Sequence, residues 1–170
     1  MIKKFSVLLG ALLVVAGLAS AAPPVFNMNG FYLTPQLGIA SWGGSIPFGV
    51  NAEYGLTKNI GIGGTAMLQF WNEEGISESW IMLSAEGYYH FDINVDKLDL
   101  YVGAGLGYGI YSVSGTLLSG SGSSGLILEP LAGVRYYFSP KIAASLRLTG
   151  SIVGGYTGVG GAIGVTFVLK

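Results

Sequence analysis

The sequence predicts an all-β protein, an eight-stranded antiparallel up-and-down β-barrel that spans a membrane. The 170 residues are 51% hydrophobic and only 10% charged, and 29 of them are Gly, whereas ordinary globular domains have about 25% charged residues and about 7% Gly. After residue 22, no uninterrupted apolar run approaches the roughly 20 residues of a membrane-spanning helix. A chain that is apolar overall but lacks a long apolar segment is typical of a transmembrane barrel, in which apolar residues alternate with polar or small ones.

Residues 1–21 show the three zones of a signal peptide. Two lysines near the start are followed by an apolar stretch over 6–17, and Ala-Ser-Ala at 19–21 is a small-residue cleavage site. The alternative is an N-terminal membrane anchor, which is less favoured because the apolar stretch is short for a span. The predicted organisation is therefore a signal peptide over 1–21 and one outer-membrane barrel domain over 22–170.

The composition and motifs exclude several classes of function. The absence of Cys rules out a disulfide scaffold, a thiol nucleophile and a thiolate metal site. A formal net charge of −1 provides no basic surface for nucleic acid. The segment 61–66 matches the dinucleotide-binding pattern G-x-G-x-x-A, but it lies inside an alternating stretch with no helix after it. We therefore expect no metal, no cofactor and no nucleic-acid partner.

The alternation of apolar and polar residues is clearest between residues 45 and 71. From Ile46 to Leu56 every second residue is apolar, and most residues between them are polar or small. A tight turn follows at 58–59, and the alternation resumes from Ile60. A period of two predicts strands, and no 3.6-residue period fits this stretch.

The same alternation along the chain predicts eight strands, each long enough to cross a bilayer at a tilt, which takes about 9–11 residues. Their expected bounds are 29–41, 45–57, 59–71, 78–91, 98–113, 125–138, 141–153 and 158–169. An even number of strands places both termini on one side, which we expect to be the periplasmic side. The Gly/Ser tract 114–125 is the longest connection and falls on the outer side, where longer loops are expected.

Aromatic residues gather near both ends of the predicted strands, as the interface girdles of membrane barrels do. The inner set is Tyr54, Tyr88, Tyr89, Phe91, Tyr101, Tyr136, Tyr137, Phe138 and Phe167, and the outer set is Trp42, Phe70, Trp71, Trp80, Tyr108 and Tyr111. A soluble barrel such as a lipocalin also alternates and closes, but it needs a charged exterior. Here nearly every outward residue is apolar or Gly, which favours a barrel in the bacterial outer membrane.

The lumen of the predicted barrel is just wide enough for side chains to fill, and its inward phase includes a set of charged residues. They are Glu53, Glu86, Glu129, Arg135 and Arg147. Because isolated buried charges are costly, we expect them to pair. By depth, Glu86 and Arg147 lie mid-barrel, and Glu53 and Arg135 lie toward the inner end. Glu129 lies nearer the outer mouth, where we expect it to be solvated. A structural plug is favoured over a gated polar path.

Four glycines form a column on the inward phase of the strand 98–113. They are Gly103, Gly105, Gly107 and Gly109. Gly weakens a strand unless something bulky approaches closely. We expect arginine and tyrosine side chains from other strands to occupy the space beside them.

Two stretches resemble a known superfamily. Residues 131–148, LAGVRYYFSPKIAASLRL, resemble the strand–turn–strand signature of small OmpA-like and OmpX/Ail-like outer-membrane barrels, and residues 101–109, YVGAGLGYG, resemble the Gly-rich strand before it. The resemblance implies the fold but little about activity, since the superfamily includes anchors, adhesins, enzymes and narrow channels. The chain departs at Arg135, where the family commonly has an acid, and at Leu169-Lys170, where these barrels usually end on an aromatic residue.

The leading functional hypothesis is a non-enzymatic, monomeric barrel with a role in envelope integrity or surface contact. Its expected partners are outer-membrane lipid (lipopolysaccharide or an equivalent) and the barrel assembly machinery. The outer connections supply the expected surface contacts, namely Asn72, Glu73, Glu74, Ser119 and Ser121.

Two alternatives stay open at this stage. One is a narrow channel for ions or small solutes. The other is a lipid A-modifying enzyme, by resemblance to deacylase and palmitoyltransferase barrels. That chemistry needs a His beside a Ser near the outer leaflet, whereas the only histidine, His90, falls near the inner end of its strand.

Overall fold

The chain forms a closed antiparallel barrel of eight strands. The computed structural model describes residues 26–40, 45–73, 75–93, 95–115, 123–153 and 156–170. The strands are β1 (Phe31–Ala40), β2 (Phe48–Gly55), β3 (Ile60–Glu73), β4 (Ile76–Phe91), β5 (Leu98–Gly115), β6 (Ser123–Ser139), β7 (Ile142–Val153) and β8 (Tyr156–Val168). The predicted fold class, strand number and strand order are confirmed.

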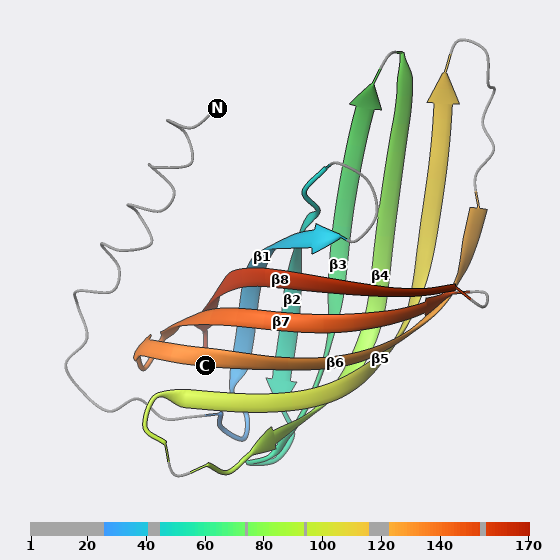
Figure 1. The fold of residues 1–170 in the computed structure, drawn as a ribbon. Coiled ribbons are helices and arrows are strands. Elements are labelled where there is room, and N and C mark those ends of the chain that lie inside the picture. The colour runs from blue at the N-terminus through green and yellow to red at the C-terminus, as the bar shows by residue number, and fades with distance from the viewer. Residues whose placement is uncertain (1–25, 41–44, 74, 94, 116–122, 154–155) are drawn as a thin grey trace, which may run out of the picture.

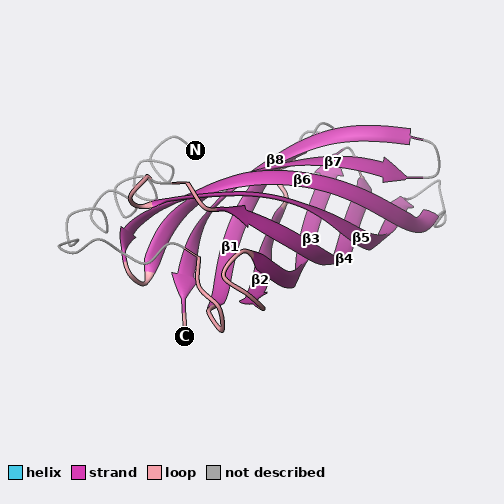
Figure 2. Cartoon of the chain, turned by 90° about the horizontal axis from the view of Figure 1, so that it is seen from below, coloured by secondary structure: helices cyan, strands magenta, loops and turns pink. Residues whose placement is uncertain are grey.

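Each strand pairs with its neighbour in the sequence, and β1 pairs with β8 to close the barrel. Figure 2 shows the strands side by side around the barrel wall. We call the end with the turns 56–59, 92–97 and 140–141 the termini end, because Phe31 and Lys170 meet there in a backbone hydrogen bond. The opposite end is the far end, where β3, β4 and β5 project well beyond β1 (Figure 1). Among the described residues, no helix is both long and apolar enough to cross a membrane.

Several strand bounds differ from the prediction at the far end. β2 begins at Phe48 and not at residue 45, whereas β3, β4, β5, β6 and β8 extend two residues further toward the far end than expected. The extensions are rich in Ser, which the sequence suggested as loop. Cross-strand pairing satisfies their backbone, as where Asn72 lies opposite Ser77, so polar side chains are tolerated there.

The side chains alternate between an apolar exterior and a polar interior. Large apolar residues face outward and are well exposed, as for Leu83 (58%), Leu106 (60%) and Ile163 (59%). The polar and charged residues of the opposite phase are buried, among them Glu53 (1%) and Arg147 (3%). This arrangement is the reverse of a soluble protein and is the one expected for a barrel surrounded by lipid.

Three tyrosines that the sequence analysis assigned to the inner girdle point into the lumen instead. Tyr88, Tyr101 and Tyr137 are 4%, 4% and 0% exposed. They share the inward phase of Glu86 and His90, and the strand period decides orientation regardless of side-chain type. The predicted outer-girdle residue Trp80 also packs inward, against Met67, Met82 and Ile127. The girdle prediction was therefore wrong for these four residues.

The side chains that lie beside the glycine column of β5 are not the ones that the sequence analysis expected. A Cβ at Gly109 would lie 2.9 Å from Ile127 Cδ1, and one at Gly103 would lie 3.0 Å from Leu131 Cδ1. A Cβ at Gly105 would meet Glu86 Cγ at 2.9 Å. The neighbours are thus apolar or acidic side chains, not the predicted arginines and tyrosines, because the arginines reach toward the carboxylates on other strands.

Candidate functional site: a closed polar lumen

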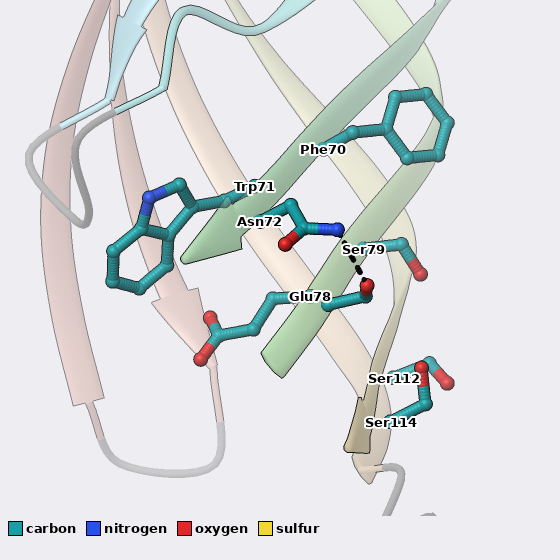
Figure 3. Close-up of a pocket in the computed structure, with 8 residues that line it drawn as sticks. Phe70, Trp71, Asn72, Glu78, Ser79, Ser112 and Ser114 are labelled. Carbon is teal, nitrogen blue, oxygen red and sulfur yellow. Dashed lines mark hydrogen bonds between the residues drawn. The ribbon is translucent and has the colours of Figure 1, made fainter. Parts of the chain in front are cut away.

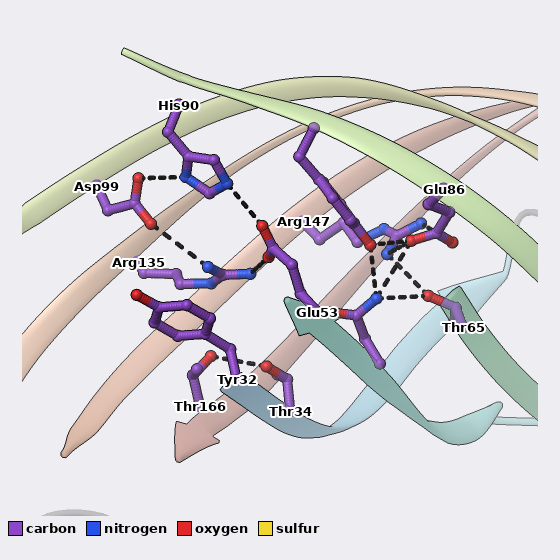
Figure 4. Close-up of polar contacts among 12 residues, drawn as sticks. Tyr32, Thr34, Glu53, Thr65, Glu86, His90, Asp99, Arg135, Arg147 and Thr166 are labelled. Atoms are coloured by element: carbon purple, nitrogen blue, oxygen red, sulfur yellow. Dashed lines mark hydrogen bonds and ion pairs between the residues drawn. The ribbon is translucent and has the colours of Figure 1, made fainter. Parts of the chain in front are cut away.

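Four ionisable side chains form a closed ring of contacts near the termini end. His90 Nε2 lies 2.7 Å from Glu53 Oε1, and His90 Nδ1 lies 2.7 Å from Asp99 Oδ1. The Arg135 guanidinium donates to Glu53 Oε2, and its other terminal nitrogen lies 3.4 Å from Asp99 Oδ2. Figure 4 shows this ring, to which β2, β4, β5 and β6 each contribute one residue. All four carboxylate oxygens therefore have a partner.

Aromatic rings enclose this termini-end ring. The ring of Phe26 stacks on His90 with centroids 3.6 Å apart and planes 1° apart. The Arg135 guanidinium lies over Tyr32 at 5.2 Å and over Tyr101 at 4.9 Å. Such cation–π contacts strengthen when water is excluded, and Arg135 is 1% exposed. Phe26 precedes β1, so the segment before the first strand also helps to close this end of the lumen.

A second cluster lies deeper in the barrel around Glu86. Arg147 contacts both oxygens of Glu86, from Nη2 to Oε1 at 2.8 Å and from Nη1 to Oε2 at 2.9 Å. This two-point contact is the geometry that makes Arg an effective carboxylate partner. Asn51 donates to Glu86 Oε2 at 3.2 Å and Ser84 Oγ donates to Oε1 at 2.5 Å. The Tyr88 hydroxyl is a further donor to Glu86. Glu86 is thus fully bonded.

Glu129 belongs to this second cluster, and the prediction that it is solvated was wrong. It is 2% exposed, and its Oε1 accepts a hydrogen bond from Arg147 Nη2 at 3.2 Å. Its other oxygen, Oε2, has no hydrogen-bond partner among the described residues. Ile127, the next inward residue of β6 toward the far end, packs with Trp80, Met67 and Met82, so an apolar layer lies on the far-end side of Glu129.

All five charged residues predicted to face the lumen do so. They are Glu53, Glu86, Glu129, Arg135 and Arg147, and every one is at most 5% exposed. The expected pairs Glu86–Arg147 and Glu53–Arg135 are both present. What the sequence analysis missed is Asp99, which is 0% exposed and bonded to both His90 and Arg135. It lies near the start of β5 and shares the inward phase of Tyr101 and the glycine column.

The structure describes only part of the predicted surface contacts. Asn72 and Glu73 belong to strand β3, with Asn72 Nδ2 donating to Ser77 Oγ at 2.9 Å, and Figure 3 shows this pair at the far end. Glu74, Ser119 and Ser121 lie outside the described residues. The expected contact surface is therefore partly a paired hairpin and not an open loop over 72–77. Within the described residues, no group of His and acidic side chains is arranged to hold a metal ion.

The fold and the filled lumen define a class, the small eight-stranded β-barrels of the outer-membrane type. The N-terminal β-barrel domain of OprF from Pseudomonas aeruginosa superposes with a TM-score of 0.68 and 19% identity, covering 84% of this chain and 98% of that domain. Ail of Yersinia pestis gives 0.59 and 15%, covering 82% and 97%. Neisserial surface protein A gives 0.59 and 19%, covering 81% and 94%.

These similarities establish the fold. A de novo designed transmembrane β-barrel matches nearly as well, with a TM-score of 0.55 and 15% identity over 86% of this chain and all (100%) of that one. No protein-family model and no curated protein sequence matches the chain. Function has to be argued from the chain's own residues, since one fold supports many activities.

Proposed function

We propose that this chain is an integral outer-membrane barrel with a closed lumen, whose role is envelope integrity or surface contact and neither transport nor catalysis. The observation that carries this proposal is the filling of the lumen in successive layers. The termini-end ring, the Glu86–Arg147 cluster and an apolar layer of Met67, Met82 and Ile127 follow one another along the barrel. None of the residues named in these layers is more than 7% exposed.

The exterior supports the membrane location. Its outward residues are apolar, and rings such as Tyr54, Tyr89, Phe91, Tyr136 and Phe167 surround the termini end. Amphipathic rings at one level are typical of a membrane interface. A predicted signal peptide and a barrel wall of this kind together favour the bacterial outer membrane.

The environment of His90 argues against an enzyme. Both of its ring nitrogens are held by carboxylates at 2.7 Å, so neither is available to activate a serine hydroxyl, as nucleophilic catalysis requires. His90 is the only histidine in the sequence and lies near the termini end. The arrangement instead suits a structural clamp that joins β2, β4 and β5.

Charge distribution limits the kind of surface contact. Four lysines, Lys58, Lys97, Lys141 and Lys170, lie at the termini end, and both arginines of the chain lie in the lumen. The sequence places no Lys or Arg at the far end. One structure of Ail from Yersinia pestis is a complex with the heparin analogue sucrose octasulfate. A highly sulfated ligand of that kind would find no cation at the far end of this barrel.

Single-channel recording tests the closed lumen. We expect the purified protein, reconstituted in a planar bilayer, to remain silent in most insertions, because every layer of the lumen is occupied by side chains. Regular ohmic steps in most insertions would contradict the proposal and favour the narrow channel. Folding is checked in the same preparation by the different gel migration of unheated and boiled samples.

Epitope tags test the orientation. A tag inserted at Gly120, in the long Gly/Ser connection, is expected to be reachable from outside intact cells, and one at Val95 is not. The opposite labelling pattern would invert the assignment of the two ends. A signal from both tags only after cell lysis would contradict exposure at the surface.

A further inference from the structure

Toward the far end of β4 and β5, the exterior of the barrel changes from apolar to polar. Along β5 the outward residues Val102, Leu106 and Ile110 are apolar and 40–60% exposed, and they are followed by exposed Ser112 and Ser114. The apolar part of β5 runs from Leu100 to Ile110, which is ten residue-to-residue steps. At about 3.3 Å per residue and a tilt of about 40°, it covers roughly 25 Å of height, the thickness of the apolar band of such barrels. The serines therefore stand above the acyl chains.

These serines belong to a continuous polar surface that we call the serine face. It consists of Asn72, Ser77, Ser79, Ser112, Ser114 and Ser124. The strand register places Asn72 opposite Ser77 and Ser77 opposite Ser114, and it places Ser79 opposite Ser112. A hollow of about 330 Å³ lies here, lined by Phe70, Trp71 and the carboxylate-bearing Glu78 together with most of the serine face. Figure 3 shows Phe70 and Ser79 on the same side of the sheet, apart from Trp71 and Glu78.

The chemistry of the serine face is uncharged and rich in hydroxyls. Each Ser hydroxyl offers one donor and two acceptors. Ser77 Oγ and Ser124 Oγ accept bonds from Asn72 Nδ2 at 2.9 Å and the Tyr108 hydroxyl at 2.8 Å, which fixes both ends of the face. With no Lys or Arg nearby in the sequence, phosphate or sulfate has no ionic partner here. A neutral ligand with many hydroxyl groups fits this donor and acceptor set.

Continuity with the lipid-facing wall identifies the source of such a ligand. The serine face lies directly above Ile81 and Ile110 on the same exterior surface, so whatever covers it stands above the acyl chains of the surrounding leaflet. We propose that the serine face binds the neutral sugar headgroup of a glycolipid in that leaflet. This inference rests on the proposed membrane location. Phe70, which is 55% exposed, adds an apolar surface at the edge of the hollow.

Competition between two lipids tests the inference. The full-length protein in non-ionic detergent is mixed with equal amounts of digalactosyl diacylglycerol and a phosphatidylcholine with the same acyl chains. Native mass spectrometry then measures which lipid is retained. We expect a preference for the sugar lipid of about three- to tenfold, the ratio that one net hydrogen bond supplies. The triple variant Ser79→Ala, Ser112→Ala, Ser114→Ala is expected to lose the preference, and the control Leu83→Ala is expected to keep it.

Three results would overturn the inference: equal retention of both lipids by the wild type, a preference that survives in the triple variant, or equally tight binding of a soluble digalactoside. The last result would show that the sugar does not need a membrane lipid as its source. A chain that fails to fold in lipid vesicles would contradict the proposed function itself. A folded chain without lipid preference would contradict only the glycolipid site.

Discussion

The two ionic clusters of the lumen differ in how completely their charges are matched. In the termini-end ring, two carboxylates face one guanidinium and one imidazole, and each carboxylate oxygen has a partner. In the deeper cluster, two carboxylates share the single guanidinium of Arg147. Glu86 contacts both terminal nitrogens of the guanidinium, and within the described ranges Glu129 has one contact at 3.2 Å and an oxygen without a partner.

This difference separates a cluster in which every carboxylate oxygen is paired from one that holds a surplus carboxylate. On the cation side of the ring, Arg135 Nε has no hydrogen-bond partner among the described residues. Buried charges are tolerated when they are paired and hydrogen-bonded, and breaking such a pair is far more costly than replacing it whole. The termini-end ring should therefore fail as a unit, because every member serves two others. The deeper cluster should depend on Arg147 and Glu86 and be nearly indifferent to Glu129. Three sets of variants test this contrast, and a further pair of glycine variants tests the packing of the inward face; they follow in order of expected effect.

Removing Arg135 is expected to have the largest effect. Arg135→Ala leaves Glu53 and Asp99 buried without their shared cation and also removes the contacts with Tyr32 and Tyr101. We expect a loss of unfolding free energy at or above the 3–5 kcal/mol typical of a broken buried pair, that is about 5 kcal/mol. Urea unfolding in detergent micelles, followed by tryptophan fluorescence, measures it. The control is Lys141→Ala at an exposed position, which is expected to keep its unfolding free energy within about 0.5 kcal/mol of wild type. An equally small change for Arg135→Ala would contradict the claim that Arg135 holds the termini-end ring together.

Arg147 and Glu86 should be energetically coupled. Arg147→Ala is expected to cost about 3–5 kcal/mol, and adding Glu86→Gln should recover part of that loss. Recovery is partial because Glu129 also loses the one hydrogen-bond partner it has in the described part of the chain. A double-mutant cycle on the same unfolding midpoints gives the coupling energy. Simple additivity of the two changes would mean that the residues act independently, against the observed two-point contact.

Glycine positions on the inner and outer faces of neighbouring strands provide a matched pair. A Cβ at Gly107 would lie 2.9 Å from the Leu83 carbonyl oxygen and 3.2 Å from Ser84 Cβ, whereas a Cβ at Gly87 would meet nothing within 4 Å. Gly107→Ala is therefore expected to cost about 1–3 kcal/mol through overpacking, and Gly87→Ala to be near neutral. Equal unfolding midpoints for the two variants would contradict close packing on the inward face.

Glu129→Gln is expected to have the smallest effect. Its carboxylate is the surplus negative charge of the deeper cluster, so neutralising it should change the unfolding free energy by no more than about 1 kcal/mol, in either direction. The matched substitution Glu53→Gln in the complete ring should cost clearly more, about 2–3 kcal/mol. If Glu129→Gln proves the more damaging of the two, the contrast between the clusters is wrong.

The strand period carried most of what the sequence could predict. Period-two alternation determined the number of strands, their order and the inward phase of Glu53, Glu86, Glu129, Arg135 and Arg147, since neighbouring side chains in a strand point to opposite faces. Depth along the strands was also sufficient to predict one partner of each arginine, Glu86 for Arg147 and Glu53 for Arg135. Where side-chain type was preferred over phase, as for Tyr88 and Trp80, the prediction failed.

Contacts that involve several strands at once could be known only from the tertiary structure. The ring around His90 joins residues of β2, β4, β5 and β6, so Asp99 acquires its role from the register that places it opposite Arg135. The apolar layer on the far-end side of Glu129 likewise depends on Ile127 and Trp80 packing from two different strands, and no single stretch of sequence shows that. Alternation within a strand is a local property of the backbone, and the sequence reveals it directly. The closure of a barrel brings together residues as distant in sequence as Thr34 and Thr166, which are 132 positions apart, and such contacts exist only in the folded chain.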